Sequence, residues 1–226
     1  MLTKKSQLRD LALRRQKSKW SGYRCIGDYH GGKYECDYVS PYSISAHNVD
    51  ASLIVLLQDW ASDEVLSRDF LQDRCTVGHD PTRWTNRHLK NLLKTYFDVE
   101  FDDIYATNVF PFVKLGSMNA GVKRKDLVRA ATEFALPQIR FIAPRFAICL
   151  GKAAFNAVAA AAGMPKAKTL DIAIETPFLV GETKVWCQAH TGQQGRNFRN
   201  RGGVDRVSTD WARMAAAYSP ETAALR

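Results

Sequence analysis

The chain has 226 residues, 46% of them hydrophobic, and its 32 Lys and Arg against 23 Asp and Glu give a formal net charge of +9. This length suits one α/β domain with a substantial core, and the apolar content excludes disorder over most of the chain. No apolar run approaches the roughly 20 residues of a membrane span, and the basic N-terminus lacks the apolar centre of a signal peptide, so we expect a cytoplasmic protein. The charge favours an anionic partner, most often nucleic acid, although a basic protein without such a partner fits it equally well.

The N-terminal 20 residues carry seven Lys and Arg residues around Leu8, Leu11 and Leu13. We expect residues 1–20 to form a short basic helix or a mobile arm. Such a segment holds phosphates without reading sequence, or it is simply a solvated tail. We expect residues 21–50, which are rich in Gly, Tyr and Ser, to be mostly loop.

Four apolar runs of strand length follow in order, at residues 51–57, 103–109, 145–150 and 185–189. Continuous apolar runs of this length are typical of parallel strands buried on both faces. Helices are expected at the apolar stripe of residues 89–97, at 125–143 with Pro137 kinking or dividing it, at 152–162, and around 207–214. This alternation predicts a three-layer α/β/α sandwich with a central, mainly parallel four-stranded sheet, and a single domain over residues 21–226.

Three of these predicted strands end in polar residues. The first ends at Gln58, Asp59 and Trp60, the second at Asn108 shortly before Phe110, and the last leads into His190. Because ligands bind beyond the carboxyl ends of the strands in open α/β sheets, these ends predict one shared site. Asp59 as a helix N-cap and Asn108 as a turn residue are the structural alternatives.

The segment after His190 is polar, basic and rich in glycine. Its hydroxyl, amide and guanidinium donors suit a phosphate backbone. We therefore expect DNA contacts from Thr191, Gly192, Gln193, Arg196, Asn197 and Arg199.

The five cysteines, Cys25, Cys36, Cys75, Cys149 and Cys187, form no Cys-x-x-Cys pair. The last two lie in apolar runs and are expected in the core. A metal site would need the first three to converge in space, so we predict no metal and no cofactor.

The ordered motifs Leu57-Gln58-Asp59-Trp60-Ala61, Thr107-Asn108-Val109 and His190-Thr191-Gly192 resemble those of the uracil-DNA glycosylase superfamily over roughly residues 50–200. Leu57 stands where that family has a glycine, Trp60 replaces its proline, Ala61 its Tyr or Gly, and Thr191-Gly192 its Pro-Ser. The resemblance implies hydrolysis of the N-glycosidic bond of uracil, or of a related deaminated base such as hypoxanthine or xanthine, in flipped-out DNA, by a monomer.

In this resemblance Asp59 falls where the water-activating residue stands, His190 donates to the uracil O2, and Asn108 reads N3–H and O4. Gln58, Trp60 and Phe110 complete the base site. The stacking aromatic is Phe70, Trp84, Trp60 or Phe110, and the wedge is Phe198, Gln193 or Gln194. The departures leave open a non-catalytic nucleic-acid- or nucleotide-binding module that retains the fold.

Overall fold

A computed structural model describes residues 3–218 of the chain. Its centre is a five-stranded sheet in the order β3-β2-β5-β7-β6. The strands are β2 (Leu53–Asp59), β3 (Tyr105–Phe110), β5 (Phe146–Leu150), β6 (Phe178–Val180) and β7 (Thr183–Gln188). All neighbours are parallel except β6 and β7, which pair antiparallel. A separate two-stranded ribbon joins β1 (Tyr23–Arg24) to β4 (Val113–Lys114).

The central strands form because their side chains are apolar on both faces. In β2, Ile54 and Leu56 belong to one hydrophobic cluster, whereas Leu53, Val55 and Leu57 belong to a second cluster on the opposite face. This is the two-residue period of a strand, and covering both faces accounts for the uninterrupted apolar run.

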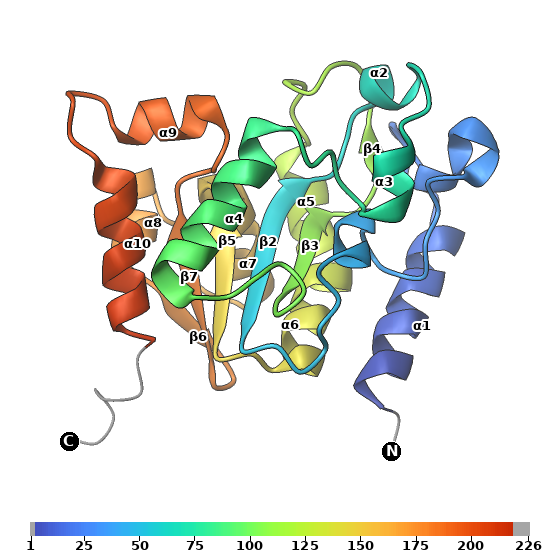
Figure 1. The fold of residues 1–226 in the computed structure, drawn as a ribbon. Coiled ribbons are helices and arrows are strands. Elements are labelled where there is room, and N and C mark those ends of the chain that lie inside the picture. The colour runs from blue at the N-terminus through green and yellow to red at the C-terminus, as the bar shows by residue number, and fades with distance from the viewer. Residues whose placement is uncertain (1–2, 219–226) are drawn as a thin grey trace.

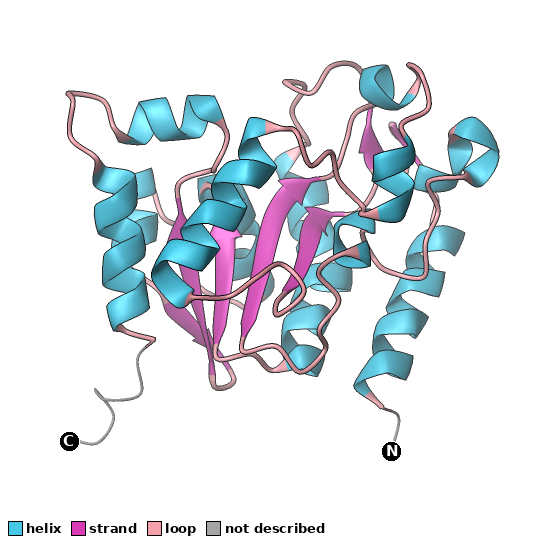
Figure 2. Ribbon diagram, in the orientation of Figure 1, coloured by secondary structure: helices cyan, strands magenta, loops and turns pink. Residues whose placement is uncertain are grey.

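Helices cover each face of the sheet (Figures 1 and 2). On one face lie the helices α1 (Lys4–Lys17), α5 (Arg124–Ala130), a π-helical segment (Ala131–Ala135), α6 (Leu136–Ile142), α7 (Lys152–Ala161) and α8 (Leu170–Glu175). The other packs against α4 (Trp84–Phe97) and α10 (Arg206–Ala216). The short helices α2 (Asp63–Leu66), α3 (Gln72–Thr76) and α9 (Gln193–Arg199) lie at the edge where the parallel strands end. Three 3₁₀ turns, Ile26–Asp28, His30–Gly32 and Pro41–Ile44, complete the elements.

The predicted α/β class and the mainly parallel sheet are confirmed, but the sheet has five strands rather than four. The missing strand, β6, is only three residues long, and its middle residue Leu179 is 61% exposed. It joins β7 through a tight hairpin at Gly181, whose φ is 59°. So short an edge strand carries almost no apolar pattern for sequence reasoning to detect.

The basic N-terminal segment is a helix, and it packs against the domain. In α1, Leu8 and Leu11 are buried, and Arg15 is fully buried in an ion pair with Glu35, while its Nη2 donates to the Tyr38 carbonyl at 2.8 Å. Residues 4–17 are therefore neither a mobile arm nor a solvated tail.

The helix predicted over residues 125–143 is present and is continuous through a π-helical turn. Pro137 has no N–H to donate to the carbonyl of Glu133, and the guanidinium of Arg14 donates to that carbonyl instead. The proline thus places a turn of the long helix in contact with α1.

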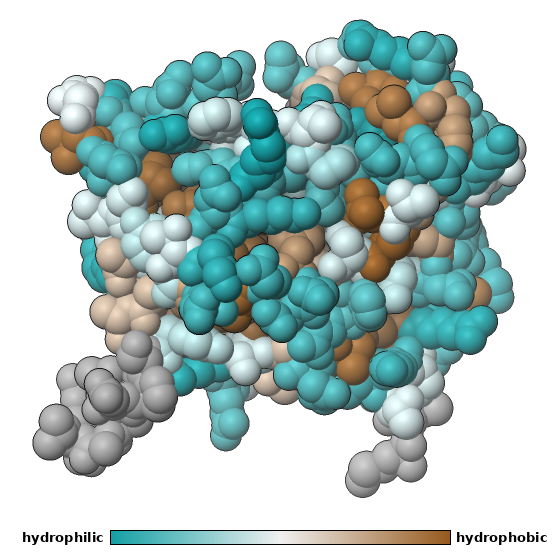
Figure 3. Space-filling view, in the orientation of Figure 1, coloured by the Kyte–Doolittle hydropathy of each residue, from teal (hydrophilic) through white to brown (hydrophobic). Residues whose placement is uncertain are grey.

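Polar residues dominate the face of the molecule that carries α4, and apolar side chains show there only in separate patches (Figure 3). Such a surface suits a polar or charged ligand better than an apolar partner. Within residues 3–218, no helix has the length and apolar character needed to cross a bilayer.

Candidate functional site

A cleft opens at the carboxyl edge of the parallel strands. Asp59, the last residue of β2, and His190, two residues beyond β7, both line this cleft, whose volume is about 580 Å³. The same two residues line a smaller inner cavity of about 80 Å³, and His190 also borders a third cavity of about 590 Å³ on the side of α9. The structure therefore brings together the carboxylate and the imidazole that sequence reasoning placed at strand ends.

The Asp59 carboxylate is held by two donors. The Lys114 Nζ lies 3.0 Å from one oxygen, and the Gln58 Nε2 donates to the other at 2.8 Å. The Lys114 side chain is 5% exposed and that of Asp59 is 7% exposed, and the Nζ also donates to the Met118 carbonyl at 2.7 Å. A carboxylate accepts about four hydrogen bonds, so each oxygen keeps capacity for a water or a ligand.

Sequence reasoning missed Lys114. It is the single charged residue that closes the run Phe110-Pro111-Phe112-Val113-Lys114, directly after the strand that carries Asn108. A lone lysine at the end of a buried apolar run was the available signal, because a buried charge needs a counter-charge.

His190 is fixed in one tautomer by the backbone. Its Nδ1 accepts the Gly192 N–H at 3.0 Å, so the neutral ring carries its proton on Nε2. Surrounding protein lowers the pKa of His190 below its ordinary value, Asp59 opposes this, and Lys114 reinforces it. At neutral pH the ring is therefore uncharged and offers Nε2–H to the cleft.

Glycines allow the chain to pack closely around His190. A Cβ on Gly195 would lie 2.3 Å from the His190 carbonyl oxygen, and one on Gly192 would lie 3.0 Å from its Nδ1. The Thr191 hydroxyl donates to the Thr85 carbonyl at 3.1 Å, which ties this loop to the start of α4. Thr191 is 1% exposed, so its side chain is not placed to contact DNA in this arrangement.

Asn108 and Phe110 do not reach the cleft. Asn108 is fully buried, lines neither cavity, and its Oδ1 accepts from the Ser40 hydroxyl at 2.5 Å. Phe110 is fully buried against Trp20 and Tyr23. Neither residue is therefore placed to contact a base in the cleft. Residues 40–47 run along β3 on the side of Asn108, as the bond from the Ala106 N–H to the Ala46 carbonyl shows, whereas Trp20 and Tyr23 pack against Phe110.

The other residues proposed to contact a base lie at the site. Gln58 borders the cleft, and Trp60 lines the inner cavity, where its indole N–H donates to the Gly78 carbonyl at 2.8 Å. Among the stacking candidates, Trp84 lines the cleft with 44% of its surface exposed. Phe70 instead stacks on Tyr34 and lines none of these three cavities.

The basic segment after His190 divides into two parts. Gly192 and Gln193 line the cleft, Asn197 is exposed, and the Arg196 guanidinium lies 5.9 Å from the centre of the Trp84 ring. Arg199 points elsewhere: it is 9% exposed and pairs with Asp210, at 2.6 Å, and with Asp171. Both carboxylates occupy its donors, so Arg199 is not placed to hold a phosphate in this arrangement.

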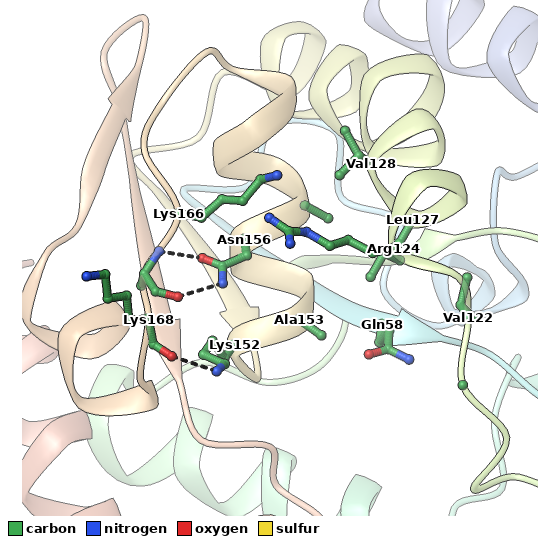
Figure 4. A pocket seen from close by; sticks show the side chains of 13 residues that line it. Gln58, Val122, Arg124, Leu127, Val128, Lys152, Ala153, Asn156, Lys166 and Lys168 are labelled. Atoms are coloured by element: carbon green, nitrogen blue, oxygen red, sulfur yellow. Dashed lines mark hydrogen bonds between the residues drawn. The ribbon is translucent and has the colours of Figure 1, made fainter.

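A basic cavity of about 540 Å³ adjoins the cleft and shares Gln58, Lys152 and Ala153 with it. In Figure 4 the ends of Arg124 and Lys166 reach toward the same space. Lys168 also lines it, and no acidic residue among residues 3–218 does. The loop that carries the two later lysines is fixed to α7 by paired bonds between the Asn156 side chain and the Ala167 backbone, at 2.8 and 2.9 Å. The cavity therefore suits an anion.

Over residues 3–218, no three His, Cys, Asp or Glu side chains form a group that could hold a metal ion. Cys149 and Cys187 are buried in the core, as expected. No model of a known protein family matches the chain, and no curated protein matches it.

Proposed function

We propose that this protein is a DNA glycosylase that hydrolyses the N-glycosidic bond of uracil, or of a related deaminated base. One observation carries the proposal: the Asp59 carboxylate at the end of β2 and the neutral His190 imidazole in the loop after β7 line the same cleft and the same inner cavity. The motif resemblance supports the same chemistry.

Breaking this bond places positive charge on the sugar and negative charge on the departing base. A preorganised negative group near the sugar and a preorganised hydrogen-bond donor near the base stabilise such a transition state. Asp59 faces the sugar, orients the attacking water with its free lone pairs and receives support from Lys114 and Gln58. The Nε2–H of His190 donates to the base oxygen on which charge accumulates. The products are the free base and an abasic site whose new hydroxyl comes from water.

The surroundings of the cleft suit a DNA strand with one base turned out. Trp84 and Phe198 are exposed aromatic residues, 44% and 57%, and each lies beside an arginine: Arg196 near Trp84 and Arg201 over Phe198. Aromatic faces stack on bases, and the cations attract phosphates. The basic cavity around Lys152 extends this charge away from the cleft. Turning the base out costs a few kcal/mol, which these contacts offset.

The second candidate is a non-catalytic nucleic-acid- or nucleotide-binding module. Two observations favour it: Lys114 already pairs with Asp59, and Asn108 lies outside the cavities. A module of this kind binds DNA and releases no base.

The two candidates separate in an excision assay. Single-stranded and duplex oligonucleotides with one uracil are incubated with the protein, abasic sites are counted after alkaline cleavage, and binding is followed by fluorescence anisotropy. We expect Asp59→Asn and His190→Gln to lower excision by orders of magnitude while binding changes only a few-fold. Asp102→Asn and His47→Gln, at exposed positions, are the matched controls.

Wild-type binding without any abasic site would favour the module. Excision that is undiminished in Asp59→Asn would remove this carboxylate from the mechanism.

A further inference from the structure

The inner cavity has a wall that the glycosylase resemblance does not include. Arg74 of α3 and His79 of the loop before α4 line it together with Asp59, Trp60 and His190. Arg74 is 5% exposed and His79 is 2% exposed. Both belong to the segment between β2 and α4.

Arg74 is a buried cation that forms no ion pair among the described residues, although Asp80 lines the same cavity. Burial lowers the pKa of Arg74, and the Asp80 charge opposes this shift. Within residues 3–218 its guanidinium makes no ion pair and no hydrogen bond, and its Nε is buried without a partner. The nearby Asp80 side chain accepts instead from the Thr82 N–H at 2.9 Å and from its hydroxyl at 2.7 Å. The guanidinium lies 5.8 Å from the centre of the Trp60 ring. An unpaired buried arginine is costly for folding, so its place beside a cavity indicates a ligand that accepts hydrogen bonds.

His79 offers the complementary group. Its Nδ1 lies 3.0 Å from the Val77 carbonyl, and a carbonyl only accepts, so the proton is on Nδ1 and Nε2 is a bare acceptor. That Nε2 is buried and has no partner among residues 3–218. The ring is stacked on Tyr42, with centroids 5.1 Å apart and planes at 19°. Burial lowers the pKa of His79 to about 4, so Nε2 stays an acceptor at neutral pH.

The size of the cavity limits its occupant. A water-sized site needs about 10–15 Å³, so 80 Å³ holds roughly five to eight such sites. This matches one six-membered heterocycle and is far below the roughly 300 Å³ at which drug-sized pockets begin. The size favours a pyrimidine over a purine.

We propose that Arg74 and His79 recognise the edge of a pyrimidine on which a carbonyl stands next to a ring N–H. Arg74 donates to the carbonyl oxygen, and Nε2 of His79 accepts from the N–H. This inference rests on the proposed function and assigns to these two residues the reading role that Asn108 does not fill. Cytosine presents an amino donor to Arg74 and a bare nitrogen to His79, which leaves four polar groups unpaired and rejects that base.

The test measures binding of 1-methyluracil, 1-methylcytosine and 1,3-dimethyluracil to the full chain by isothermal calorimetry; in all three N1 is blocked, as it is by the sugar in DNA. Wild type should bind 1-methyluracil at least 10-fold more tightly than either other base, because 1,3-dimethyluracil lacks the ring N–H and 1-methylcytosine reverses the pattern. Arg74→Met should weaken 1-methyluracil binding at least 10-fold. His79→Phe, which keeps the aromatic ring, should bind 1-methyluracil and 1,3-dimethyluracil equally. Arg87→Met and His47→Phe, at exposed positions outside this cavity, should behave as wild type.

Equal wild-type affinity for the three bases, no binding of 1-methyluracil at 10 mM, or unchanged discrimination in both variants would overturn the inference. The wild-type panel decides the question even where a variant does not fold. An excision assay separates this inference from the proposed function. Selective binding without base release would contradict the glycosylase activity and support base recognition by Arg74 and His79. Uracil excision with full rejection of cytosine in both variants would support the activity and contradict that recognition.

Discussion

The Lys114–Asp59 pair should act as one energetic unit at the floor of the cleft. Its atoms are 3.0 Å apart, and the two side chains are 5% and 7% exposed. Removing one partner of a buried pair costs about 3–5 kcal/mol, because the other charge is left uncompensated. For a chain of this size each kcal/mol lowers Tm by about 2–4 °C, so Lys114→Met should lower Tm by roughly 6–20 °C.

A double-mutant cycle measures the coupling directly. Urea unfolding of wild type, Lys114→Met, Asp59→Asn and the double variant should give a coupling energy of about 1–3 kcal/mol, since the double variant leaves no buried charge. Lys94→Met is the matched control: Lys94 forms an ion pair of 2.8 Å with Asp98, but the two side chains are 55% and 87% exposed. That variant should unfold close to wild type.

Additive effects would show that Lys114 and Asp59 are not coupled. If the double variant loses the sum of the two single losses, to within about 0.5 kcal/mol, the two groups do not compensate each other. The carboxylate would then be held by Gln58 and solvent, and Lys114 would not belong to the site.

Two further predictions concern the inner cavity and the histidine loop. The pKa of His79 lies at about 4 in the folded protein against 6.5 as its ordinary value, so the unfolded chain binds the extra proton and stability falls as the pH drops from 6.5 to 4. Over that interval wild type should lose about 3 kcal/mol more than His79→Gln in urea unfolding, and parallel curves would contradict this. Gly195→Ala should lower both Tm and base release, because its Cβ would lie 2.3 Å from the His190 carbonyl oxygen. Gly121→Ala, whose Cβ would have open space, should change neither. A Gly195→Ala variant with the Tm and base release of the wild type would show that this close packing is not needed.

The parts of the fold that depend on local pattern could be predicted from the sequence. Apolar runs of strand length gave the four parallel strands, and strand direction alone put Asp59 and His190 at the same edge. The three-residue strand β6 escaped because Leu179, its middle residue, is exposed and the run is too short for a period.

The choice of partner for each polar side chain could not be predicted, because it depends on contacts between distant segments. The Ser40 hydroxyl donates to Asn108, although the two residues are 68 positions apart and no local sequence pattern links them. Arg199 likewise finds Asp171 and Asp210 rather than DNA. Lys114 forms an ion pair with Asp59, which lies on a different strand. Periodicity reports which face is apolar, and it carries no information on such pairings.

Mass spectrometry of the small molecules released from uracil-containing single-stranded DNA tests the central claim most directly. We expect wild type to liberate free uracil from the oligonucleotide and Asp59→Asn, folded and bound to the same DNA, to liberate almost none. A wild-type protein that binds the strand yet leaves every uracil, hypoxanthine and xanthine attached would contradict it.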